Sequence, residues 1–151
     1  MEKQHALQRL EQLQKKLYAI HYACSAMNLD ADTVAPKNTS EGRGVALGVL
    51  AGEEQQLMIC PETRALLDEL DRQKDELDLL HRREVEELRR RCDQLTRIPA
   101  EEYIAYSELV NKAGDVWHKA KEKDDFAMFC PLLQELVEYN RKFAAYYDST
   151  R

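Results

Sequence analysis

The stretch from Ala6 to Met27 reads ALQRLEQLQKKLYAIHYACSAM, and it decides the fold. Small and apolar residues recur along it in alternating steps of four and three: Ala6, Leu10, Leu13, Leu17, Ile20, Cys24 and Met27. This spacing places them on one face of an α-helix, whereas a half-buried strand would alternate with a period of two. The sequence therefore predicts a long first helix, with Cys24 packed as a small core residue.

The same stepping of three and four residues recurs along the rest of the chain, and no segment alternates with a period of two. Pro61 and Pro99 suit the first turns of helices, and Pro131 is expected at or near the first turn of the last helix. The pattern predicts an all-α fold of about six mostly antiparallel helices joined by short turns. The expected helices cover residues 2–28, 39–58, 61–72, 75–97, 99–123 and 126–147 of a single region, 1–151.

The segment between the first two helices is typical of an ordered loop. It runs from Asp30 to Asn38, and Pro36 disfavours helical backbone at the residue before it. Asn38, with Glu41 three residues later, resembles the capping box that begins a helix. We therefore expect the second helix to begin directly after Asn38.

The second helix carries glycines at intervals of four residues on one face: Gly44, Gly48 and Gly52. Each glycine costs a helix about 1 kcal/mol relative to alanine, so packing has to compensate. We expect a close crossing with another helix, and the alternative is a close approach of the backbone to a ligand.

Composition excludes several classes of protein. The chain has 151 residues with 22 Lys plus Arg and 28 Asp plus Glu, a net charge of −6 that disfavours binding to nucleic acid or to an anionic membrane. No apolar run approaches the roughly 20 residues of a membrane span, and the N-terminus lacks the apolar core of a signal peptide. The cysteines lie more than thirty residues apart, which excludes a C-x-x-C zinc or redox motif. We expect a cytoplasmic protein.

None of the candidate metal sites in the sequence is complete. His81-x-x-Glu84 falls short of H-x-x-E-H because Val85 stands where the second histidine is needed. The pairs Glu2/His5, Asp78/His81 and Asp115/His118 have the spacing of a di-metal Glu-x-x-His motif. The last pair is disfavoured because Asp115 should face water if Trp117 belongs to the core. The arginines of the run 89–91 have acidic neighbours at helical spacing, which indicates a solvated, ion-paired face. We predict no catalytic and no metal-binding residue.

Three stretches have the form of known family segments. Residues 29–36, LDADTVAP, are similar to a W-D-x-x-T-x-x-P loop through Asp30, Thr33 and Pro36, with Leu29 in place of tryptophan. Residues 98–103, IPAEEY, are similar to an I-P-x-E-x segment through Pro99. Residues 117–133 are similar to W-x-x-A-R-x-x-x-D-F-x-x-F-x-P-x-L, with Lys121 in place of arginine; the matching residues include Trp117, Asp125, Phe126, Phe129 and Pro131. In this order they resemble the front portion of the carboxypeptidase Taq family of zinc metallocarboxypeptidases.

The resemblance implies that the chain is a helical-bundle fragment of a larger, zincin-type helical fold. Family members bind zinc through H-E-x-x-H and a later glutamate, which lie beyond the portion that this chain resembles, so no catalytic or metal position is carried over. The implied role is an N-terminal cover and groove wall in an enzyme that removes single residues from peptide C-termini. We expect the chain to be inactive alone, with zinc and peptide substrate bound only by the full-length parent.

The implied partners are the remainder of the parent carboxypeptidase and a second copy of the chain, because an apolar face would otherwise stay uncovered. We therefore expect a homo-oligomer, a homodimer in the simplest case. The alternative reading is a stand-alone helical interaction module whose apolar face binds a partner helix.

Overall fold

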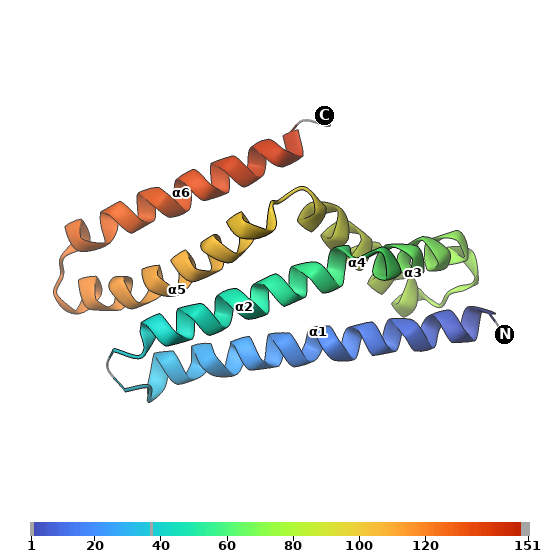
Figure 1. The fold of residues 1–151 in the computed structure, drawn as a ribbon, viewed down its shortest axis with the longest axis horizontal. Coiled ribbons are helices and arrows are strands. Elements are labelled where there is room, and N and C mark those ends of the chain that lie inside the picture. The colour runs from blue at the N-terminus through green and yellow to red at the C-terminus, as the bar shows by residue number, and fades with distance from the viewer. Residues whose placement is uncertain (1, 37, 149–151) are drawn as a thin grey trace. The chain divides into compact units, whose positions relative to one another are not determined.

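The computed structural model describes residues 2–36 and 38–148, and all regular structure within them is helical (Figure 1). The prediction of an all-α fold is confirmed. A single short 3-10 turn, η1 (Lys74–Glu76), interrupts the α-helices of the described residues. These are α1 (Glu2–Thr33), α2 (Ser40–Ile59), α3 (Pro61–Arg72), α4 (Leu79–Thr96), α5 (Ala100–Glu122) and α6 (Phe126–Asp148). None of the described helices combines the length and the apolar character needed to cross a membrane.

The chain divides into two compact units, and each is built from two separate segments. The first unit consists of the described residues within Met1–Ala23 and Glu53–Arg97. The second unit consists of the described residues within Cys24–Gly52 and Ile98–Arg151. Helices α1 and α2 therefore contribute residues to both units.

The core of the first unit is built from aliphatic side chains on α1, α2, α3 and α4. The largest of these side chains that are almost completely buried are Leu10, Met58, Leu67, Leu70 and Val85. Helix α3 packs against α4, and Pro61 occupies its first turn as expected. Because these apolar residues recur at helical spacing, each helix turns one face inward and leaves the charged face to solvent.

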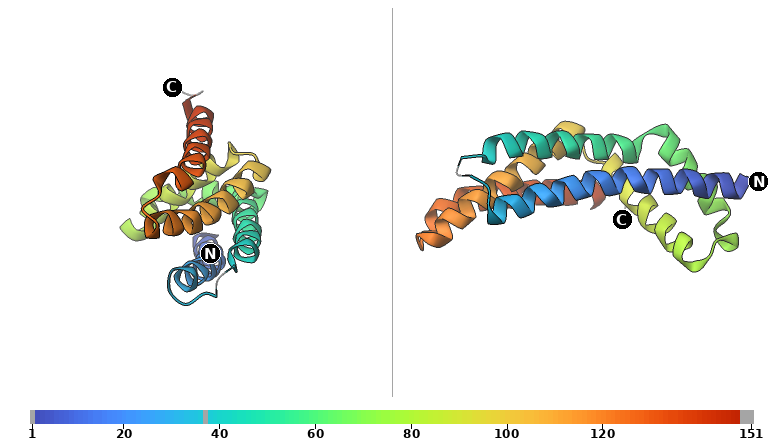
Figure 2. Two further views of the ribbon diagram at one scale, coloured as in Figure 1. Left: turned by 90° about the vertical axis from the view of Figure 1, so that its left-hand side faces the viewer. Right: turned by 90° about the horizontal axis from the view of Figure 1, so that it is seen from below.

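The second unit contains the antiparallel pair α5 and α6, which lie side by side in the views of Figures 1 and 2. Leu109, Ala113 and Leu132 are buried between them, and half-buried Phe129 packs against this cluster. Further along the pair, Tyr106 contacts Tyr139 and Phe143, with ring centroids 5.7 and 5.2 Å apart. Aromatic pairs at such distances add to the stability that their burial provides.

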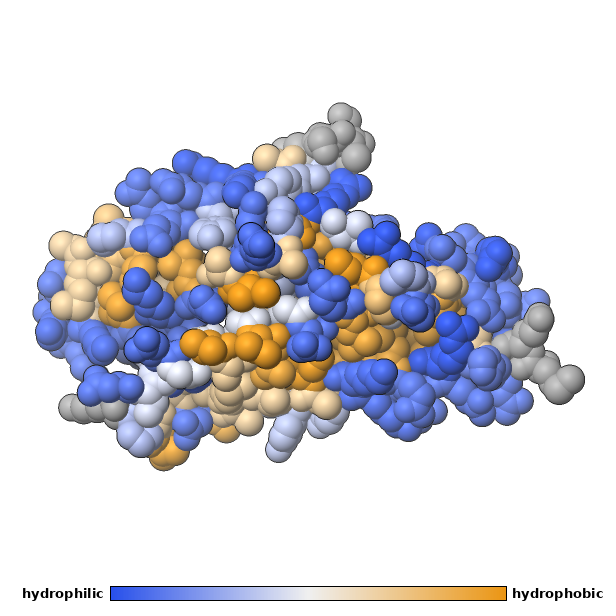
Figure 3. All heavy atoms as spheres, in the orientation of Figure 1, coloured by the Kyte–Doolittle hydropathy of each residue, from blue (hydrophilic) through white to orange (hydrophobic). Residues whose placement is uncertain are grey.

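The glycine face of α2 lies against side chains of α5, which supports the expected helix crossing over a ligand contact. A Cβ atom on Gly48 would lie 3.0 Å from Glu108 Cγ and 3.3 Å from Ile104 Cγ2. On Gly52 it would lie 3.0 Å from Ile104 Cδ1, and on Gly44 it would lie 3.0 Å from Asn111 Nδ2. The glycines therefore leave room for side chains of α5 to lie directly on the backbone of α2. On the face of the molecule where α2 lies nearest the viewer, hydrophobic surface remains visible among hydrophilic side chains (Figure 3).

The prediction of a loop over residues 30–38 is wrong for its first half, because α1 continues to Thr33 instead of ending near residue 28. The carbonyl oxygen of Asp30 accepts hydrogen bonds from the backbone N–H groups of Val34 (3.0 Å) and Ala35 (2.8 Å). Residues 29–33 contain no proline or glycine, and the helix stops only where Pro36 excludes helical backbone at the residue before it.

The expected capping box at Asn38 is also wrong. Asn38 has a φ of 69°, a left-handed conformation that an N-cap residue does not adopt. Helix α2 begins at Ser40, so Thr39 occupies the cap position. The Thr39 side-chain hydroxyl donates a hydrogen bond of 2.9 Å to the carbonyl oxygen of Pro36.

The start of α4 and the position of Pro131 within α6 also differ from the expected ones. Helix α4 begins at Leu79 rather than 75, because Asp78 caps it by accepting a 2.9 Å hydrogen bond from the His81 backbone N–H. Pro131 lies inside α6, in its second turn, because that helix already begins at Phe126. Asp125 is the N-cap residue of α6, and its Oδ1 lies 3.2 Å from the Met128 backbone nitrogen.

Candidate functional site

The described residues bring together no group of three or more His, Cys, Asp and Glu side chains that could hold a metal ion. His81 and Asp78 do meet, with 2.7 Å between His81 Nδ1 and Asp78 Oδ2, but this pair forms the N-terminal cap of α4. The hydrogen bond from the His81 backbone and the one from its side chain lower the pKa of Asp78. The Glu2 side chain, the partner expected for His5, lies outside the described residues.

Asp115 and Trp117 are oriented opposite to expectation. The Asp115 carboxylate accepts a 2.7 Å hydrogen bond from Arg43 Nη2 on α2. Arg43 Nε also donates to Asn111 Oδ1 at 2.8 Å. Trp117, expected in the core, is 43% exposed. Periodicity alone missed this arrangement because it does not show that Arg43 supplies a charged partner from another helix.

A polar pocket of about 400 Å³ lies in the second unit, between the α1–α2 loop and the end of α5. The end of α1 contributes Asp32, the loop contributes Thr39, and α5 contributes His118 and Glu122. His118 Nε2 lies 3.4 Å from Asp32 Oδ1, a long contact between two exposed side chains. The pocket carries both signs of charge, and the described contacts include no nucleophile hydrogen-bonded to a base.

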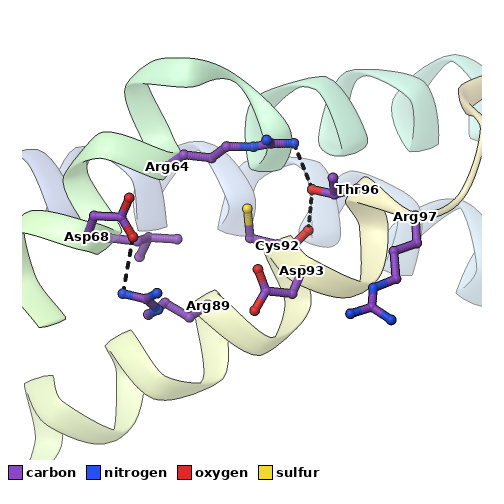
Figure 4. A pocket seen from close by; sticks show the side chains of 8 residues that line it. Arg64, Asp68, Arg89, Cys92, Asp93, Thr96 and Arg97 are labelled. Atoms are coloured by element: carbon purple, nitrogen blue, oxygen red, sulfur yellow. Dashed lines mark hydrogen bonds and ion pairs between the residues drawn. The ribbon is translucent and has the colours of Figure 1, made fainter. Parts of the chain in front are cut away.

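A second pocket, of about 260 Å³, lies in the first unit between α3 and α4 (Figure 4). Arg89 lines this pocket and contacts Asp68 Oδ1 at 3.2 Å and Asp71 Oδ2 at 3.0 Å. On the opposite side, Arg64 Nη2 donates to Thr96 Oγ1 at 2.8 Å. The Thr96 hydroxyl donates in turn to the carbonyl oxygen of Cys92 at 2.8 Å.

Cys92 lies buried in the wall of this second pocket, and its environment disfavours nucleophilic chemistry. Burial raises the pKa of the Cys92 thiol, and the nearby Arg64 guanidinium offsets that effect only in part. A thiol with a raised pKa stays protonated at neutral pH, whereas the thiolate is the reactive form. With Arg89 held by two carboxylates, the pocket is an ion-paired junction of two helices.

A buried carboxylate that the sequence analysis missed lies between α1, α2 and α4. Glu54 is only 7% exposed. It accepts a hydrogen bond from Arg91 Nη2, and its Oε1 lies 3.0 Å from His21 Nε2. Arg91 therefore pairs with a buried acid, which corrects the expectation that the whole arginine run forms a solvated face. One signal was available: Glu54 continues the spacing of Leu47, Ala51 and Met58, the buried face of α2.

The residues of the first family-like segment have local roles at the end of α1. Asp30 accepts the last backbone hydrogen bonds of that helix through its carbonyl oxygen. The Thr33 hydroxyl donates to the carbonyl oxygen of Leu29 at 2.6 Å, and the Pro36 carbonyl accepts the hydroxyl of Thr39. These residues shape the turn between α1 and α2.

The residues of the other two segments lie at the ends of α5 and α6. Pro99 is the N-cap residue of α5, and its carbonyl oxygen accepts the backbone N–H of Tyr103 at 3.1 Å. Asp125 caps α6 and Phe129 packs on the core between α5 and α6. Trp117 and Phe126 differ from these residues, because both remain substantially exposed.

Comparison with known proteins identifies the family that this chain matches. Residues 9–151 match the carboxypeptidase Taq (M32) metallopeptidase family. The chain is 34% identical over 129 residues to Carboxypeptidase 1 of Bacillus subtilis, covering 84% of this chain and 26% of the relative. It is 29% identical over 132 residues to Thermostable carboxypeptidase 1 of Pyrococcus furiosus, covering 87% of this chain and 26% of the relative.

Solved structures give the same result. The crystal structure of BsuCP matches 94% of this chain and 29% of its own, with a TM-score of 0.89 at 31% identity. Metallocarboxypeptidase 1 of Trypanosoma cruzi matches 94% of this chain and 28% of its own, with a TM-score of 0.69 at 30% identity. The chain thus spans about a quarter of the length of the curated relatives that it matches.

Proposed function

Because the chain belongs to the carboxypeptidase Taq (M32) metallopeptidase family, we propose that it forms the N-terminal helical cover and groove wall of a zinc-dependent carboxypeptidase. That enzyme would remove single residues from peptide C-termini. The observation that carries the proposal is the match over residues 9–151 combined with a coverage of only 26% of the relatives. The partner of this chain is then the remainder of the full-length enzyme.

The reaction itself belongs to residues outside this chain. A catalytic zinc site needs three protein ligands and an open position for water, and the sequence contains no H-E-x-x-H. The histidines with described partners do not form such a site, because each of them contacts one acidic side chain. His81 pairs with Asp78 at the start of α4, His21 with buried Glu54, and His118 with Asp32. We therefore assign no step of the hydrolysis to this chain.

What the chain supplies is a preformed helical scaffold. Both polar pockets are crossed by ion pairs, Arg89 with Asp68 and Arg43 with Asp115. Their charges are largely neutralised within each unit, so neither pocket presents a strong field to a passing peptide. A wall of this kind positions substrate by shape, while the charged and metal groups that act on the peptide lie elsewhere.

The proposal is tested by grafting residues 9–151 into Bacillus subtilis Carboxypeptidase 1 in place of the matching segment. Three proteins are compared with zinc and an N-blocked peptide: the graft, the same enzyme without the segment, and the free chain. We expect the graft alone to release C-terminal amino acids, measured by mass spectrometry. Chelator-sensitive release by the free chain would contradict the proposal. Full activity of the enzyme without the segment would contradict it too, and would favour an independent interaction module.

A further inference from the structure

Helix α5 has three faces, and two of them are already covered within the second unit. One face packs on α6 through Leu109 and Ala113, and another meets the glycines of α2. The third face carries Val110, which is 46% exposed, and Trp117, which is 43% exposed. These two residues are seven apart, or about two helical turns, so they lie on the same face.

The third face also contains an open position. Gly114 lies between Val110 and Trp117, and a Cβ atom placed on it would meet nothing within 4 Å. The side chain of Lys121 reaches back over the tryptophan, with Nζ 5.0 Å from the Trp117 ring centroid. We call Val110, Gly114, Trp117 and Lys121 the outer face of α5.

We propose that the outer face of α5 docks the continuing polypeptide of the full-length carboxypeptidase, and this inference rests on the proposed function. The matched part of BsuCP is only 29% of that chain, yet it keeps this helical arrangement with a TM-score of 0.89. Most of the polypeptide therefore lies outside the matched part and has to be joined to these helices. A large aromatic side chain beside an open glycine is the kind of anchor that such joints use.

The side chains of the outer face also indicate what kind of segment would bind there. Gly114 lets an apolar segment approach the α5 backbone closely, with Val110 and Trp117 on either side of it. Lys121 at the edge favours a carboxylate on the occupant, because interfaces place opposite charges against each other. The two exposed valines on the outward side of α2, Val45 and Val49, offer less contact area and no aromatic anchor. They serve as the matched control surface.

The test uses the graft described above and the free chain. Both are exposed to hydroxyl radicals, and oxidation of Trp117, the only tryptophan of this chain, is measured by peptide mass spectrometry. We expect Trp117 to oxidise severalfold more slowly in the graft than in the free chain. Val110→Lys should lower the melting temperature of the graft and leave that of the free chain unchanged. Val45→Lys, the control, should leave both unchanged.

Each contrary outcome has a defined meaning. Equal oxidation of Trp117 in the two proteins, or equal effects of Val110→Lys and Val45→Lys on the graft, overturns the docking proposal. If Trp117 of the free chain becomes protected as the protein concentration rises, the outer face binds a second copy of the chain, and the docking proposal is overturned. A graft that does not fold overturns the proposal as well. A graft that is active with Trp117 unprotected leaves the proposed function standing, whereas a protected but inactive graft leaves only the docking standing.

Discussion

Gly48 and Gly114 are both helical glycines, and their surroundings give them opposite importance. Gly48 faces Glu108 and Ile104 of α5 at distances that a methyl group would crowd, whereas Gly114 faces open space. The intrinsic cost of glycine in a helix is the same at both positions. Contact between helices therefore decides which glycine the fold requires.

Alanine substitutions at these two positions should have effects of opposite sign. Gly48→Ala gains about 1 kcal/mol of helix propensity, but crowding of a packed contact costs about 1–3 kcal/mol, so we expect net destabilisation. Gly114→Ala should stabilise the free chain by up to about 1 kcal/mol. Urea unfolding of both variants measures this difference, and a stabilised Gly48→Ala variant would show that α2 and α5 do not cross closely.

The neighbouring arginines Arg90 and Arg91 provide a second comparison between single residues. Arg91 pairs with buried Glu54, whereas Arg90 pairs with Glu87 on the solvated surface. Arg91→Ala would leave the Glu54 carboxylate buried with only His21 as a partner, so we expect a loss of about 1–3 kcal/mol in the free energy of unfolding. Arg90→Ala should change it little, and similar losses for both variants would argue against a buried role for Glu54.

At the scale of elements, the start of α4 depends on one carboxylate. Asp78 accepts hydrogen bonds from the His81 backbone and the His81 side chain, and both lower its pKa. Because the pKa of Asp78 is lower in the folded state than in the unfolded state, ionised Asp78 stabilises the folded protein at any pH above its unfolded-state pKa. This stabilisation is lost as the pH falls through the folded-state pKa.

Substitutions at Asp78 should separate the cap from the charge. Asp78→Asn keeps a capping oxygen but does not titrate, so the acid-dependent part of stability from this residue should disappear while α4 still begins at Leu79. Asp78→Ala should lose both the cap and the pH dependence. Unfolding free energies from about pH 2 to pH 6 measure this, since that range spans ordinary carboxyl titration. An unchanged pH profile for Asp78→Asn would contradict the assignment.

The helices themselves were largely predictable, and their boundaries were less so. The spacing of apolar residues predicted α1, α4, α5 and α6 because a helix turns one stripe inward, and Pro61 predicted the start of α3. The extra turn of α1 was missed because residues 29–33 combine loop-like composition with no residue that forbids a helix. The cap at Asp78 was missed because the hydrophobic pattern extends through Leu77 into a 3-10 turn.

The candidate site was less predictable than the fold, for a physical reason. The ion pairs Arg43–Asp115 and Arg91–Glu54 join residues 72 and 37 positions apart. Periodicity reports which face of one helix is buried, but it does not report which charge on another helix meets it. The segment resemblance supplied the family, and the roles of Asp125, Pro99 and Trp117 emerged only from their contacts.

At the scale of the whole molecule, the chain should behave as a metal-free helical protein. The described residues offer no cluster of three metal ligands, and a stable zinc site requires about that many from the protein. We expect purified chain to retain less than stoichiometric zinc, measured by atomic emission, and a chelator to leave its melting temperature unchanged. A tightly bound equivalent of zinc, with a melting temperature that falls on chelation, would contradict the assignment of zinc to the rest of the enzyme.

The interleaving of the two units along the chain limits where the polypeptide can be cut or recombined. The first unit closes only when Glu53–Arg97 joins the earliest part of the chain, and the second closes only when Cys24–Gly52 joins the last part. No single cut in the polypeptide therefore separates the two units cleanly: a fragment that contains one whole unit also carries a segment of the other. A recombination event or a designed truncation between residues 24 and 97 would divide both units at once, so exchange between carboxypeptidases should keep at least this interval in one piece.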